Sequence, residues 1–126
     1  MKFLCLAYGS EADWLVLSKE EQSELLRQDR VIRDRGNYMS AVVPGVTTVS
    51  ASDALLRVVD GGFAHSRVPL AGFSIIEADD IEAVVALVAK TPCARAGGAI
   101  EIRRLLTDTD SNPDNVRSTF GKELLR

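Results

Sequence analysis

The only histidine of the chain, His65, follows Asp60 by five positions in the segment VVDGGFAHSRVPLAGF. A histidine titrates near neutral pH and a neighbouring carboxylate fixes its tautomer, so this pair has the composition of a general base with its orienting acid. The alternative is that Asp60 caps a tight turn through its side chain while His65 points into solvent. The alternative is favoured over catalysis, and both residues stay candidates for contact with a ligand.

Aromatic and basic residues supply the other candidates for a ligand-binding cleft. Aromatic rings can line a pocket wall, and an arginine can bind an acidic group through its planar guanidinium. Core packing of the rings and solvation of the arginines are the alternatives, and no catalytic residue is assigned. The residues expected to contact a ligand are Tyr8, Trp14, Asp60, Phe63, His65, Arg67 and Arg95.

Two cysteines and one histidine leave the sequence little capacity to hold a metal ion. Cys5 lies in an apolar run and is expected to behave as a small buried hydrophobe. Cys93 follows a proline near the end of a predicted helix, where the helix dipole disfavours a thiolate. No phosphate-binding glycine loop is present. We therefore expect no metal, no cofactor and reduced cysteines, as in a cytoplasmic protein.

Length and composition are typical of one soluble globular domain: 126 residues, 46% hydrophobic and 26% charged. The net charge of −3 argues against nucleic acid as a partner, because phosphate binding requires a basic surface. No apolar run reaches the ~18 residues of a membrane-spanning helix. The start MKFLCLAYG is too short for a signal peptide. We therefore expect no membrane association.

The spacing of apolar residues predicts an alternation of strands and helices. A capping box, with Ser18 three residues before Glu21, marks the start of the first long helix, and Gly36 marks its end. The predicted helices cover residues 19–35 and 81–90, and the predicted strands cover residues 2–8, 38–43, 71–77 and 99–106.

The middle of the chain is predicted to form a hairpin, and its end a polar extension. Residues 54–59 are predicted to form a hairpin with residues 64–68 around an Asp60-Gly61 turn. Residues 46–52 suit either an edge strand or a loop. From residue 107 the chain turns polar, so the prediction is a domain over 1–106 followed by a C-terminal extension over 107–126.

This order predicts an α+β fold in which two main helices cover one face of an antiparallel sheet. The strand KFLCLAY, residues 2–8, is apolar on both faces. One helical layer covers only one of those faces, so something else must cover the other. A second copy of the chain is the simplest candidate, and we expect a homodimer.

Four blocks, MKFLCLAYGSEADW, VVDGGF, AGFSIIEADDIEAVVALVAKTP and AGGAIEIRRL, together resemble the DGPF/YCII-related family. The resemblance covers about residues 1–106 and implies a ferredoxin-like fold that pairs into a dimeric α/β barrel, with a cleft between sheet and helices. Two departures matter. Gly62 replaces the proline of the family motif, and Ala96 stands where many relatives place a histidine. The His–Asp pair of the YCII branch is therefore not carried over.

Two functions follow, and whether the protein is an enzyme stays open. The first is the binding of a small molecule in a cleft near residues 60–67, with no reaction assigned. The second is a non-catalytic interaction or regulatory module that acts through its dimer surface or its C-terminal tail. The resemblance implies almost nothing about a reaction, because function belongs to the site and not to the fold.

Overall fold

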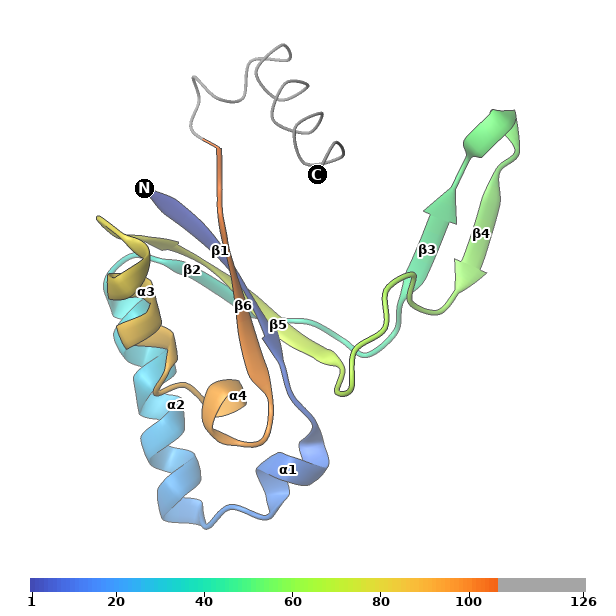
Figure 1. Ribbon diagram of the computed structural model, residues 1–126. Coiled ribbons are helices and arrows are strands. Elements are labelled where there is room, and N and C mark those ends of the chain that lie inside the picture. The colour runs from blue at the N-terminus through green and yellow to red at the C-terminus, as the bar shows by residue number, and fades with distance from the viewer. Residues whose placement is uncertain (107–126) are drawn as a thin grey trace.

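Four antiparallel strands form the main sheet of the computed structural model, which describes residues 1–106. The order across the sheet is β2-β5-β1-β6 (Figure 1), with bounds Tyr38–Ala41, Leu70–Glu77, Lys2–Tyr8 and Ala99–Arg104. One long helix lies between β1 and β2 in the chain and a second helix lies between β5 and β6. This βαββαβ order is the ferredoxin-like α+β arrangement that the sequence predicts.

The two main helices, α2 (Lys19–Asp34) and α3 (Ile81–Val88), lie on the same side of the sheet (Figure 1). The capping box of α2 forms as predicted: the Glu21 N–H donates to Ser18 Oγ at 3.1 Å and the Ser18 N–H donates to Glu21 Oε1 at 3.2 Å. The predicted span 19–35 is confirmed to within one residue. Helix α3 begins where the Ala83 N–H donates to Asp80 Oδ1 at 2.9 Å.

The core lies between these helices and the sheet. Alternation along β1 turns Phe3 and Cys5 toward the helices, where both are buried. From β5 and the helices, the other buried apolar side chains are Ile76, Ile32, Val84 and Val88. This one-sided core accounts for the burial of a single face of each central strand.

The other side of the main sheet carries apolar side chains that no helix of residues 1–106 covers (Figure 1). We call this side the open face. Two of its rings, those of Tyr38 and Phe73, lie with centroids 5.7 Å apart, and Tyr38 is 60% exposed. By register, the apolar residues of the open face are Leu4, Leu6, Tyr8, Tyr38, Leu70, Phe73 and Ile75.

A second, two-stranded sheet forms a separate hairpin that we call the arm, residues 46–61. Strand β3 (Thr47–Ser50) pairs with β4 (Arg57–Asp60) across a tip that contains the short 3-10 helix η1 (Ser52–Ala54). The predicted hairpin of 54–59 with 64–68 is therefore wrong, because β4 takes its partner from the preceding segment. The tip can turn because Asp53 and Ala54 adopt left-handed backbone angles, with φ of 56° and 60°.

Two short helices complete the described residues. Helix α1 (Glu11–Leu15) follows β1, and α4 (Pro92–Arg95) stands before β6. Cys93 therefore lies at the start of a short helix and not near the end of a longer one, since α3 stops at Val88. No helix within residues 1–106 is long and apolar enough to cross a membrane.

Candidate functional site

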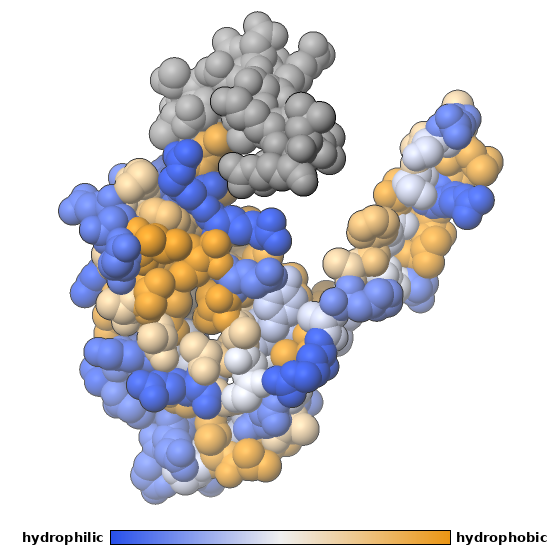
Figure 2. Space-filling model, viewed as in Figure 1, coloured by the Kyte–Doolittle hydropathy of each residue, from blue (hydrophilic) through white to orange (hydrophobic). Residues whose placement is uncertain are grey.

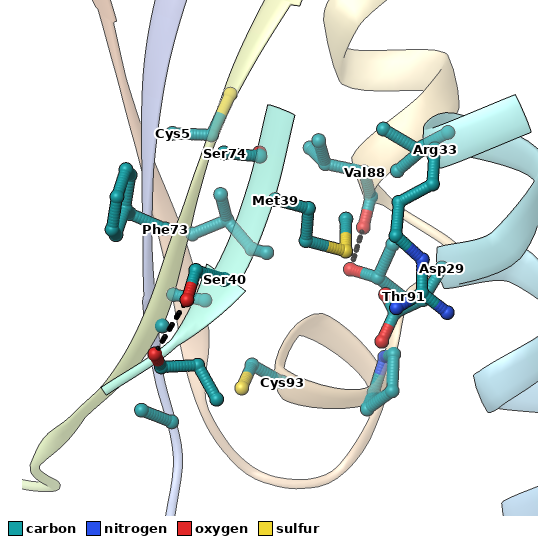
Figure 3. Close-up of a pocket in the computed structure, with 17 residues that line it drawn as sticks. Cys5, Asp29, Arg33, Met39, Ser40, Phe73, Ser74, Val88, Thr91 and Cys93 are labelled. Atoms are coloured by element: carbon teal, nitrogen blue, oxygen red, sulfur yellow. Dashed lines mark hydrogen bonds between the residues drawn. The ribbon is translucent and has the colours of Figure 1, made fainter. Parts of the chain in front are cut away.

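A hollow of about 230 Å³ lies between the main sheet and helices α2 and α4 (Figure 3). Residues of all four strands form its floor, and residues of both helices form its wall. Its volume is below the ~300–1,000 Å³ of drug-sized sites. The hollow therefore suits a small molecule, about the size of one ring.

Two charged side chains of α2 border this hollow, Asp29 and, one turn later, Arg33 (Figure 3). Burial raises the pKa of the Asp29 carboxyl, and the nearby Arg33 lowers it by a smaller amount. Asp29 thus keeps its proton to a higher pH than an ordinary aspartate does. The Arg33 guanidinium donates hydrogen bonds, so this wall is suited to a ligand that carries an acceptor oxygen.

Replacing Asp29 with asparagine should remove a pH-dependent decrease in the free energy of unfolding, which arises from ionisation of the buried carboxyl. The folded chain holds the Asp29 proton more tightly than the unfolded chain, because the folded pKa lies above the ordinary value of 3.8. The decrease is absent below pH 3.8, grows as the pH rises through the folded pKa, and is constant above it. Measured by urea unfolding, Asp29→Asn should gain more stability over the wild type at about pH 7 than at about pH 3.

Glu24, on the exposed side of the same helix, provides a control of opposite sign. Hydrogen bonds from Arg27 and Gln28 hold the pKa of Glu24 at about 2, below its ordinary 4.5. Its contribution is therefore present at neutral pH and is lost as the pH falls toward 2. Glu24→Gln should thus cost more stability at about pH 7 than at about pH 3. An Asp29→Asn effect that is equal at both pH values would contradict the assignment of Asp29.

Two cysteine thiols also border the hollow, and both are free. Burial raises the pKa of Cys5, while a hydrogen bond with Ser74 on the neighbouring strand lowers it by a smaller amount. Burial, and next the negative charge of Asp29, raise the pKa of Cys93. Both groups are therefore thiols at neutral pH, so neither is an activated nucleophile. The sequence predicts low reactivity of Cys93 from its position near the end of a helix. The structure gives burial as the physical reason instead.

The hydroxyl groups around the hollow already have partners. Thr91 Oγ1 donates to the Val88 carbonyl at 2.6 Å, and Ser40 Oγ donates to the Ala41 carbonyl at 2.9 Å (Figure 3). Within residues 1–106, no buried side-chain N or O atom is left without a hydrogen bond. Asp29 and Arg33 are thus the polar groups best placed to meet a ligand, and the rest of the lining is mostly apolar.

Three of the residues expected to bind a ligand lie around the sheet but do not line this hollow. Tyr8 is on the open face, where a hydrogen bond with Glu101 raises the pKa of its hydroxyl. Trp14 borders a second hollow, which shares Ala71, Pro92 and Cys93 with the first. Arg95 borders a third, on the outer side of α2.

The other four candidates belong to the arm and to the segment that follows it. Asp60 ends β4, paired with Thr47 in the arm, and His65 lies in the irregular segment before β5. Within residues 1–106, no hydrogen bond or ion pair joins these two side chains. Phe63 is 86% exposed, and Arg67 donates to the Gly97 carbonyl at 2.8 Å. None of the four borders a hollow described here.

The sequence interpretation missed Asp29 and Arg33. A usable signal was present: Asp29 lies three positions before Ile32, so helical periodicity places it toward the inner side of α2. Nothing local distinguishes it from the other acids of this helix, because its burial comes from residues far away in the chain, with Cys93 of α4 among its neighbours. No group of three or more His, Cys, Asp or Glu side chains that could hold a metal occurs among residues 1–106.

The chain matches one protein family over most of its length. No curated protein matches it. One solved structure to which it is similar is 5-chloro-2-hydroxyhydroquinone dehydrochlorinase of Burkholderia phenoliruptrix AC1100, in complex with 2,5-dihydroxybenzoquinone. The two chains are 18% identical in sequence and superpose with a TM-score of 0.45. The match covers 89% of this chain and 100% of the other. The YCII-related domain matches residues 1–107, so this chain belongs to the YCII-related domain family.

Proposed function

We propose that this protein binds a small, largely apolar molecule with one acceptor oxygen in the hollow between the sheet and helices α2 and α4. The observation that carries the proposal is the combination of a ring-sized hollow with Asp29 and Arg33 on one wall. An apolar body would replace water along the floor, while the acceptor would meet the Arg33 guanidinium on the wall. No reaction is assigned, because the neighbouring thiols are not activated.

The expected contacts at Asp60, Phe63, His65 and Arg67 form a second part of this proposal. These residues lie outside the hollow, so a role in binding requires that another subunit bring them to a ligand. We infer that the protein is a homodimer, supported by the uncovered apolar residues of the open face. Two free cysteines are consistent with a reducing, cytoplasmic location.

A substitution that fills the hollow tests the binding site. We expect one or more of benzoate, benzyl alcohol and cyclohexanol to raise the midpoint of thermal unfolding of the wild type. Binding stabilises by about 2.7 kcal/mol at a concentration 100-fold above Kd. Ala7→Leu places a larger side chain on the floor of the hollow and should abolish most of this stabilisation. Fluorescence of Trp14, the only tryptophan, supplies a second measurement.

The matched control is Ala86→Leu, on the exposed side of α3, which should leave the stabilisation unchanged. Comparison of benzoate with benzyl alcohol tests the charge preference of the wall that Arg33 and Asp29 form. A ligand that stabilises the wild type and Ala7→Leu equally would contradict this location for the site. No stabilisation by any of the three probes would contradict the proposed ligand class.

A further inference from the structure

We propose that the arm, residues 46–61, binds a second copy of this chain, with the Val49–Val58 side of the hairpin lying against the partner. The proposal rests on the homodimer inferred above and goes beyond it, because it assigns a function to a segment outside the ligand site. The arm is then the element that holds two subunits together around their open faces.

The first observation is that the arm has no support from its own chain. Within residues 1–106, β3 and β4 pair with each other and with no other strand, and neither packs extensively on another element. Its base is closed by hydrogen bonds of its own: the Gly61 N–H donates to the Val46 carbonyl at 2.9 Å, and Thr48 Oγ1 donates to the Gly61 carbonyl at 2.6 Å. An isolated two-stranded hairpin is marginally stable in water at best, so an added contact is expected.

The second observation is that the arm exposes a directly paired apolar contact at its centre. Val49 and Val58 lie directly opposite each other on one side, and they are 62% and 60% exposed. Ser50 and Arg57 lie opposite each other on the other side. Thr47 and Asp60 share the side of Val49 and Val58, whereas Thr48 and Val59 share the side of Ser50 and Arg57, so Val49–Val58 is the one fully apolar pair among the four. Leu55 and Leu56 at the tip add exposed apolar surface.

The third observation is the position of the arm. It projects away from the sheet on the side opposite α2 and α3 (Figure 1). Figure 2 shows that it stands clear of the body, with hydrophobic residues along its length. The arm thus projects on the same side of the sheet as the open face.

A second copy is the occupant that fits this side. Two subunits related by a two-fold axis each offer the same apolar open face and the same arm, so each arm can reach its partner while the partner's arm returns the contact. The Val49–Val58 side requires an apolar partner surface, and this chain supplies one in Leu4, Leu6 and Ile75.

The experiment is sedimentation equilibrium of the full chain and three variants, with circular dichroism to check that each is folded. The wild type should sediment at twice the chain mass of 13.7 kDa. Val49→Lys places a charge in the proposed contact and should raise the dimer Kd about tenfold or more. Ser50→Lys, the adjacent residue on the other side of the hairpin, is the matched control and should stay within about threefold of the wild type.

The third variant replaces residues 47–60 with Asn-Gly, a two-residue turn that joins the hydrogen-bonded pair Val46 and Gly61. It should weaken the dimer at least as much as Val49→Lys does. A wild-type monomer at tens of micromolar would overturn both the arm contact and the homodimer. A wild-type dimer with unchanged Kd in Val49→Lys and the shortened chain would overturn the arm contact alone. Equal weakening by Ser50→Lys and Val49→Lys would overturn the assignment of the contacting side.

Discussion

Replacing Gly98 with alanine is expected to lower the free energy of unfolding by about 3 kcal/mol. A Cβ atom at this position would overlap the carbonyl oxygen of Tyr8 and would lie 2.8 Å from that of Cys93. Both are backbone atoms of packed elements, the end of β1 and the start of α4, so neither can rotate away as a side chain would. Urea unfolding of Gly98→Ala measures the loss.

Gly45→Ala is the matched control for this substitution. Nothing lies within 4 Å of a Cβ at Gly45, and its backbone is not left-handed. The control should change the free energy of unfolding by no more than about 1 kcal/mol. Equal effects at the two glycines would contradict a steric cause. The Gly98 N–H also donates to the Cys93 carbonyl at 3.1 Å, so this close approach helps to hold Cys93 at the hollow.

Ile32→Ala is expected to have the second large effect, a loss of about 2–5 kcal/mol of unfolding free energy. Ile32 is 1% exposed, packs in the core and borders the hollow. Truncation removes buried apolar contacts and enlarges the hollow. The same substitution should therefore shift ligand preference toward a larger ring, which a comparison of benzoate with 2-naphthoate in thermal unfolding measures.

Leu26→Ala on the same helix provides the comparison, because Leu26 is 44% exposed. It should cost less than about 1 kcal/mol and leave ligand preference unchanged. If Leu26→Ala and Ile32→Ala lowered the free energy of unfolding equally, the exposed side of α2 around Leu26 would have to be covered by another subunit. A loss below about 1 kcal/mol at Ile32 would contradict its role in the core.

Much of the fold follows from local signals in the sequence. The Ser18–Glu21 capping box predicts the start of α2, and the structure confirms it because both hydrogen bonds of the box form within a few residues of chain. The short apolar run KFLCLAY, which Gly9 and Ser10 bound, likewise predicts the strand β1. The apolar character of KFLCLAY on both faces predicts that a partner covers the side of the sheet opposite the helices, and this stays a prediction.

The hairpin was mispredicted because its register depends on competition between segments. Residues 57–60 have candidate partners on both sides in the chain, and the Asp60-Gly61 turn favours the following one. The structure pairs them with Thr47–Ser50, since the threonines and valine there extend as a strand and the chain reverses at Asp53 and Ala54. The 107–126 extension lies outside the described residues, and the boundary at 106 stays a prediction.

The sequence by itself therefore determined the helix caps, the central strands, the ferredoxin-like order of elements and the family, because each depends on near neighbours or on the succession of blocks. Only the tertiary structure decided where the hollow lies, that Asp29 faces it, that Gly98 must be a glycine, and that the arm stands alone. Each of these depends on contacts between residues far apart in the chain. Such contacts set burial, and burial sets both the pKa of Asp29 and the apolar surface that a partner can cover.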